Sequence, residues 1–187
     1  LFAWISQVQP APSSPINFSF LDDIVNSTPR GSDIVVTIAH LPQWMHNSNN
    51  WTNNDPRKTF VDKIVIPLVN RYKNSRVVIG YQIWNEPNME ENNDNVILGF
   101  DKSPELYVEM LNYAYSKIKG INRNKKVVGS ATTAINQNYP NSFEYNKRMY
   151  NAGIKNFADI FSIHFYGNSY YNLYYPGGIK EFLNGIG

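Results

Sequence analysis

The chain has 187 residues, of which 42% are hydrophobic and 17% are charged, a composition typical of one globular domain rather than of a disordered segment. The formal net charge is only +2 and the Lys and Arg residues are scattered, which argues against a nucleic-acid-binding protein. The absence of cysteine excludes disulfides and thiol chemistry, and the sequence has no run of roughly 18 apolar residues that would predict a membrane span.

Short apolar runs alternate with stretches that have apolar residues at helical spacing. The runs that predict strands are 1–5, 34–38, 77–84, 127–131 and 159–166. The stretches that predict helices are 18–25, 56–68, 103–120 and 143–150, and a further helix is expected to begin at 179–183. The chain therefore alternates strand and helix along its whole length.

Several residues mark expected helix ends. Asp55 and Pro56 are typical of an N-cap and the first residue of a helix. Pro67 interrupts the apolar repeat of that helix and is expected to kink it or end it early. Gly120 is expected to end the helix that begins near Ser103.

Five strands separated by single helices predict parallel βα units and an α/β fold. We predict a partial (β/α)₈ TIM barrel that covers roughly strands 2 to 6, so that 1–187 is an incomplete barrel domain continuing beyond both ends. A doubly wound open sheet is the alternative. That fold normally has a Gly-rich turn after its first strand, and no G-x-G-x-x-G occurs here.

Polar or titratable residues follow three of the predicted strands, where the active site of such a barrel lies. These residues are His40, then Asn85 and Glu86, then His164 and Tyr166. The alternation of a strand places His164 and Tyr166 on one face, pointing into the barrel mouth. The sequence therefore predicts a pocket shared by three strand ends.

Glu86 is the candidate catalytic residue of this pocket. A carboxyl group beside Trp84 and Tyr166 is partly shielded from water and suits a general acid, which must hold its proton until the leaving group needs it. Local chemistry leaves a second interpretation open, in which Asn-Glu-Pro is a turn that ends the strand and Glu86 is solvated. The three histidines lack the spacing of metal ligands, so that no metal and no cofactor are expected.

The string 81–88, YQIWNEPN, resembles the fourth-strand signature of clan A glycoside hydrolases, the retaining barrels that include families 5 and 39. The resemblance implies that Glu86 is the acid/base and that Asn85 binds the sugar 2-hydroxyl. The stretch 103–131 is similar to the fourth helix and fifth strand of these barrels. The run 161–166 is similar to their sixth strand, whose His and Tyr line the sugar site.

Aromatic residues near the expected pocket are candidate sugar contacts. His40 and Trp44 lie where the third-strand loop of the clan contributes a His or an aromatic platform. Trp51 and Trp84 offer further stacking surfaces, although Trp84 is expected mainly to fill the barrel interior.

The nucleophile of the clan is a Glu at the end of the seventh strand, beyond this chain. The resemblance therefore implies that the complete protein is a retaining hydrolase of β-linked polysaccharide or oligosaccharide, with Glu86 as general acid/base, and that residues 1–187 alone are inactive. A non-catalytic carbohydrate-binding or structural protein on the same barrel is the alternative, and an unrelated α/β protein is a third.

Three N-x-Ser/Thr sequons begin at Asn17, Asn26 and Asn50. Sequons are glycosylated in secreted proteins, so they favour an extracellular or cell-surface location. A carbohydrate substrate is the expected partner.

Overall fold

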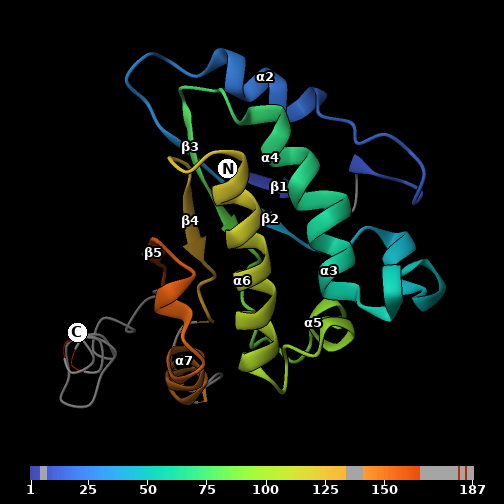
Figure 1. Ribbon diagram of the computed structural model, residues 1–187, viewed down its shortest axis with the longest axis vertical. Coiled ribbons are helices and arrows are strands. Elements are labelled where there is room, and N and C mark those ends of the chain that lie inside the picture. Colours follow the sequence, from blue (N-terminus) through green and yellow to red (C-terminus); the bar gives the residue numbers. More distant parts are fainter. Residues whose placement is uncertain (5–7, 134–140, 165–180, 182–183, 185–187) are drawn as a thin grey trace.

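The computed structural model describes residues 1–4, 8–133, 141–164, 181 and 184. Its centre is a five-stranded parallel sheet in the order β1-β2-β3-β4-β5 (Figure 1). The strands are β1 (Phe2–Trp4), β2 (Ile34–Ala39), β3 (Val78–Ile83), β4 (Lys126–Gly129) and β5 (Ile160–Phe161). All five predicted strands are therefore present. The predicted end of the last one, at Tyr166, lies outside the described residues.

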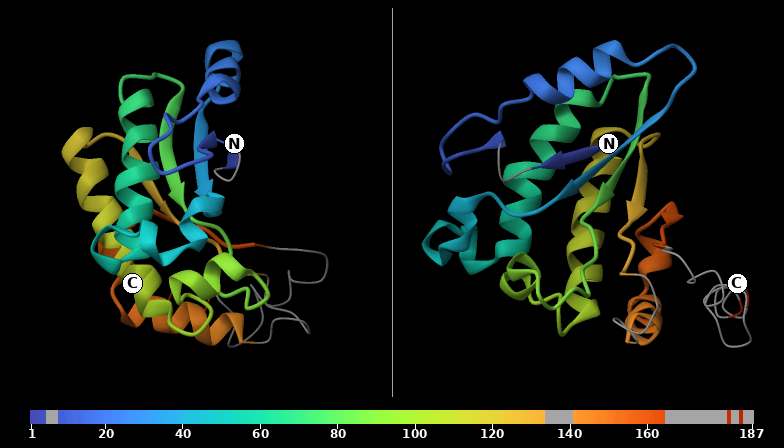
Figure 2. Two further views of the ribbon diagram at one scale, coloured as in Figure 1. Left: turned by 90° about the vertical axis from the view of Figure 1, so that its right-hand side faces the viewer. Right: turned by 180° about the vertical axis from the view of Figure 1, so that it is seen from behind.

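Helices connect successive strands, and α3, α4 and α6 cover one face of the sheet (Figures 1 and 2). The longer helices are α2 (Ser19–Ser27), α3 (Pro56–Phe60), α4 (Ile66–Tyr72), α5 (Asn93–Leu98), α6 (Pro104–Ile121) and α7 (Ser142–Asn151). The short 3-10 helices are η1 (Gln43–His46), η2 (Ser48–Asn50), η3 (Thr52–Asn54) and η5 (Ile154–Asn156), and η4 (Val61–Val65) is a π-helical segment. No helix within the described ranges is both long and apolar enough to cross a membrane.

The strand order distinguishes the two folds that the sequence leaves open. Each strand lies beside the strand that precedes it in the chain, and every pair is parallel. A doubly wound sheet reverses its order partway and carries helices on both faces. Consecutive strands in unbroken order are the arrangement of a (β/α)₈ barrel. The predicted partial barrel is therefore confirmed, and the doubly wound alternative is wrong.

The register of the strands sorts their side chains onto two faces. Val36, Tyr81 and Val127 are register partners, and all three are fully buried in the core beneath the helices. The next register row contains Thr37, Gln82 and Val128. It lies on the opposite face of the sheet, because side chains alternate along a strand. That opposite face is the one that points toward the axis of a complete barrel.

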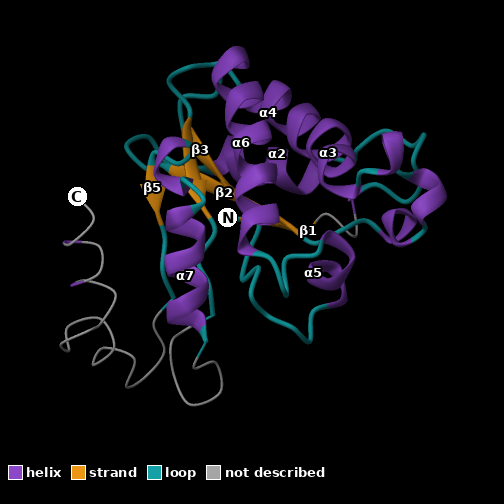
Figure 3. Ribbon diagram, turned by 60° about the horizontal axis from the view of Figure 1, so that its bottom comes forward, coloured by secondary structure: helices purple, strands orange, loops and turns teal. Residues whose placement is uncertain are grey.

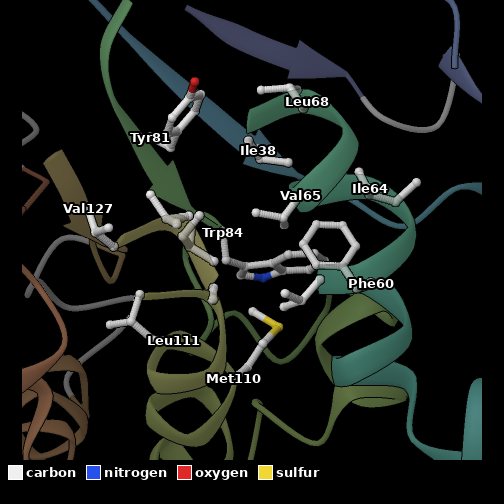
Figure 4. Packing of buried hydrophobic residues seen from close by; sticks show 14 of the residues in the cluster. Ile38, Phe60, Ile64, Val65, Leu68, Tyr81, Trp84, Met110, Leu111 and Val127 are labelled. Atoms are coloured by element: carbon white, nitrogen blue, oxygen red, sulfur yellow. The ribbon is translucent and has the colours of Figure 1, made fainter. Parts of the chain in front are cut away.

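Trp84 occupies the centre of the core between the sheet and the helices (Figure 4). It is fully buried, and its ring makes edge-on contacts to Phe60 and Phe100, with centroid distances of 5.2 and 5.8 Å. Its φ of 76° is left-handed, which ends the strand alternation and turns the side chain toward the helices. The expectation that Trp84 fills the barrel interior is therefore wrong.

The helix that begins after Asp55 runs to Tyr72 without a break. The Asp55 carboxylate caps it as predicted, accepting hydrogen bonds from two backbone N–H groups of the first turn at 3.0 and 3.1 Å. Its middle, 61–65, is the wider π-helical turn, and Pro67 is the second residue of the α-helical segment that follows. A proline has no N–H to donate, and here the helical bonding pattern has already shifted, so the predicted early stop does not occur.

The helix α6 also extends further than expected. It includes Gly120 and ends at Ile121, with Asn122 as the C-cap. Gly120 is therefore not the terminating residue. The boundary differs from the prediction by one residue and does not affect the face that α6 presents to the sheet.

Candidate active site

Glu86 and His164 meet at the C-terminal end of the sheet, which is turned toward the viewer in Figure 3. Oε1 of Glu86 lies 2.7 Å from Nδ1 of His164, a hydrogen-bond distance. The two side chains are 16% and 25% exposed, so both are partly withdrawn from water and still accessible. The structure thus brings together two residues, 78 positions apart in sequence, that follow β3 and β5.

The backbone of Glu86 is held in an unusual conformation. Its φ is 46°, in the left-handed region, where a residue other than glycine costs about 1–3 kcal/mol and persists only when its surroundings fix it. The Glu86 N–H donates to the carbonyl of Ala131 at 2.9 Å, and Nδ2 of Asn95 donates to the Glu86 carbonyl at 2.8 Å. The segment that follows β4 and the helix α5 therefore both hold the backbone that carries the Glu86 carboxyl group.

Asn85 precedes Glu86 in the same turn. Its side chain is half-buried, and its Oδ1 is shielded from solvent without a hydrogen-bond donor among the described residues. Leaving a buried acceptor unpaired is unfavourable. The Oδ1 of Asn85 is therefore a buried acceptor to which the described residues supply no donor.

His40 follows β2 and has a left-handed φ of 67°. Its Nδ1 lies 3.4 Å from Oδ2 of Asp94, and its ring is 6.4 Å from that of Trp84. Asp94 also receives the Leu41 N–H at 3.1 Å and pairs with Nε2 of His46 at 2.8 Å. His40 is thus placed at the same end of the sheet as Glu86, through contacts with α5 that the sequence does not reveal.

The carboxyl group of Asp94 has three hydrogen-bonding partners, which are His40, His46 and the Leu41 N–H. Burial raises its pKa, but hydrogen bonds from His40, from the Leu41 N–H and from His46 outweigh this effect and hold the pKa below its usual value. Asp94 is only 8% exposed. It is therefore an ionised carboxylate that is buried because its partners satisfy it.

The lowered pKa predicts a pH-dependent contribution to stability. Because the folded-state pKa lies below the unfolded one, Asp94 stabilises the fold above the unfolded pKa, and this contribution is lost as the pH falls through the folded pKa. We expect Asp94→Asn to lower the free energy of unfolding by about 1–3 kcal/mol near pH 7, and the difference from wild type to shrink in acid.

Urea denaturation of both proteins at several pH values measures this difference. The matched control is Asp23→Asn, which changes an exposed carboxylate and should leave the free energy of unfolding nearly unchanged. A stability difference between wild type and Asp94→Asn that stays constant from neutral to acid pH contradicts the prediction.

The other predicted site residues lie elsewhere or outside the described residues. Trp44 is only 8% exposed and belongs to the core, so its ring has little surface left for a sugar. Trp51 is half-buried, and its Nε1 donates to the carbonyl of Met45. The stacking role predicted for Trp44 is therefore not supported. Tyr166 lies outside the described residues.

Within the described part of the chain, no group of three or more His, Asp and Glu side chains is placed to hold a metal ion. The residues that approach one another there are instead arranged in two sets. One is Glu86 with His164, and the other is Asp94 with His40 and His46.

Comparison with known families and structures gives a consistent result. The sequence model of "Cellulase (glycosyl hydrolase family 5)" matches residues 4–175. A comparison with curated protein sequences found no match.

Three solved structures illustrate the likeness in fold. A family 39 glycoside hydrolase from the gut symbiont Bacteroides cellulosilyticus has a TM-score of 0.61 and 17% identity over 88% of this chain and 31% of that chain. A glucosidase from Croceicoccus marinus has a TM-score of 0.53 and 18% identity over 89% and 37%, respectively. A β-1,4-D-mannanase from Cryptopygus antarcticus has a TM-score of 0.52 and 14% identity over 90% and 56%.

The chain thus spans between 31% and 56% of the length of these three structures, and at such identities the likeness shows the fold alone. The family match, in contrast, covers most of the chain and includes the YQIWNEPN string that carries the resemblance to clan A. The chain therefore belongs to glycosyl hydrolase family 5.

Proposed function

We propose that the full-length protein is a retaining hydrolase of β-linked glycosides in which Glu86 is the general acid/base. The observation that carries this proposal is the Glu86 carboxyl group at the C-terminal end of β3, partly buried and 2.7 Å from His164. Family membership supports glycosidic bonds as the target. The nucleophile is a second carboxylate, which the clan resemblance assigns to a seventh strand beyond this chain.

The reaction proceeds in two displacements. In the first, Glu86 gives its proton to the glycosidic oxygen while the nucleophile attacks the anomeric carbon, which releases the leaving group and forms a glycosyl ester. In the second, Glu86 takes a proton from water as the water oxygen attacks the anomeric carbon and expels the nucleophile carboxylate. The two inversions retain the β configuration, and Glu86 finishes protonated, ready for another cycle.

His164 and Asn85 act beside Glu86 in this proposal. His164 shares a hydrogen bond with Oε1 and so orients the carboxyl group in both of its protonation states. The unpaired Oδ1 of Asn85 accepts a hydrogen bond from a sugar hydroxyl. His40 contributes a further sugar contact from the end of β2.

The substrate is a β-linked polysaccharide or oligosaccharide. Because the solved structures of similar fold include a glucosidase and a mannanase, β-glucosides and β-mannosides are the first substrates to try. We also propose an extracellular or cell-surface location. Two of the three sequon asparagines, Asn17 and Asn26, are exposed, as glycosylation requires.

Proton NMR of the full-length protein acting on 4-nitrophenyl β-mannoside, 4-nitrophenyl β-glucoside and β-1,4-mannan tests the proposal. We expect the β anomer of the released sugar to appear first, followed by mutarotation to the equilibrium mixture. An initial α anomer would show inversion and overturn the double displacement. Binding of mannan or glucan without release of reducing ends would instead favour a non-catalytic carbohydrate-binding protein on the same barrel.

A further inference from the structure

We propose that Asp94 and Asn95, two consecutive residues of α5, are positioning residues that hold His40 and Glu86 in place for the reaction proposed above. Each of the two side chains engages the end of a different strand. The catalytic part of this inference rests on the proposed function, whereas the geometric part does not.

Asn95 fixes the turn that carries Glu86. Its Nδ2 donates to the carbonyl oxygens of Glu86 and Met89, both at 2.8 Å, and its Oδ1 accepts the indole N–H of Trp84 at 2.7 Å. The residue is fully buried, so each of these three bonds forms away from water. All the hydrogen-bonding groups of this amide except one acceptor lone pair are thereby used to hold the residues from Trp84 to Met89.

Asp94 fixes the neighbouring strand end. One carboxylate oxygen, Oδ2, receives the Leu41 N–H at 3.1 Å and lies 3.4 Å from Nδ1 of His40, while Oδ1 pairs with His46 at 2.8 Å. The carboxylate therefore contacts both a backbone N–H and two side chains of the segment that follows β2. Since α5 supplies both Asp94 and Asn95, the two strand ends are tied to one short element.

The backbone at these strand ends explains why such ties are needed. His40, Trp84 and Glu86 have left-handed φ values of 67°, 76° and 46°, a conformation that side chains other than glycine rarely adopt. An unusual conformation persists only where surrounding contacts over-determine it. Asp94 contacts the first of these residues, and Asn95 contacts the other two.

The key test compares Asn95→Asp with Asn93→Asp in the full-length protein. The substitution at Asn95 keeps the size of the side chain and the oxygen that accepts the Trp84 N–H, but it replaces Nδ2 by an oxygen facing the carbonyls of Glu86 and Met89. Asn93 is exposed on the same helix, so Asn93→Asp makes the same chemical change without touching either strand end.

The leaving group of the substrate separates positioning from general damage. A 2,4-dinitrophenyl glycoside needs little protonation, whereas a methyl glycoside or mannobiose depends on Glu86 as the acid. We expect Asn95→Asp to lower kcat/KM for the poor leaving group about 10- to 100-fold more than for the activated one, because a displaced acid no longer reaches the glycosidic oxygen. An equal loss on both substrates would reflect less folded protein and would overturn the positioning role of Asn95.

Asp94→Asn serves as the second variant and has a different expected signature. It removes the charge that holds His40, a proposed sugar contact, so KM should rise and kcat/KM should fall by similar factors for both leaving groups. An unchanged KM in the folded fraction would remove Asp94 from the proposal.

A crystal structure of Asn95→Asp decides the geometric part whether or not the protein hydrolyses glycosides. We expect the Glu86–His164 contact to be lost and the φ of Glu86 to leave the left-handed region; an unchanged turn would overturn the inference. If the wild-type protein is inactive but Glu86 is displaced in the variant, the proposed function fails. The inference that Asn95 holds the Glu86 turn would still be correct.

Discussion

Glu86→Gln in the full-length protein is expected to lower kcat/KM for glycosides with poor leaving groups by about 10²- to 10⁴-fold, the usual contribution of a general acid. The amide has nearly the shape of the carboxyl group, but it has no proton to give to the glycosidic oxygen. Substrate binding should survive, because the substitution leaves the proposed sugar contacts of Asn85 and His40 unchanged.

The dependence on leaving group makes this prediction specific. Rates measured with 2,4-dinitrophenyl and methyl glycosides should differ far more in Glu86→Gln than in wild type, because only the second leaving group needs protonation. Glu90→Gln is the matched control, since Glu90 is an exposed residue of the same loop. Equal turnover of a poor leaving group by wild type and Glu86→Gln would remove Glu86 from the mechanism.

Trp84→Ala is expected to lower the free energy of unfolding by about 3–5 kcal/mol, the range for removing a large aromatic side chain from a core. The ring is fully buried between Phe60 and Phe100, and its N–H satisfies the amide oxygen of Asn95. The substitution therefore creates a cavity and leaves a buried acceptor unpaired at the same time.

Urea denaturation followed by circular dichroism measures this loss. Phe20→Ala is a suitable control, because Phe20 is 62% exposed and its truncation should change stability by about 0.5 kcal/mol or less. A loss below about 1 kcal/mol in Trp84→Ala would mean that the core between the sheet and the helices closes around the gap.

Much of the fold could be predicted because its signals are local. Apolar runs such as 34–38 and 77–84 predict buried strands, and Asp55 with Pro56 marks a helix start, since each depends on residues close in sequence. The parallel barrel order then follows from the alternation of strands and helices. The meeting of Glu86 and His164 follows in turn, because parallel strands place their C-terminal ends at one edge.

The parts that the sequence does not predict depend on contacts between distant residues. The helix α5 is six residues long and begins Asn-Asp-Asn, which has no apolar periodicity to predict it. The helix is held in place by hydrogen bonds from Asp94 and Asn95 to the segments that follow β2 and β3, which are distant in sequence from each other. Strand alternation also misplaced Trp84, because the alternation assumes an extended backbone and Trp84 is left-handed.

The π-helical turn at 61–65 keeps the buried residues of the helix between β2 and β3 on one face. The buried residues Phe60, Ile64, Leu68 and Tyr72 recur every four positions, whereas an α-helix turns once in 3.6 residues. In a regular α-helix this row would rotate by about 40° at each step and leave the sheet within a few turns. A π-helical turn contains more residues than an α-helical one, so it rotates the chain less per residue and offsets part of that drift. The residues that recur every four positions therefore stay on the face of the helix that packs against the sheet.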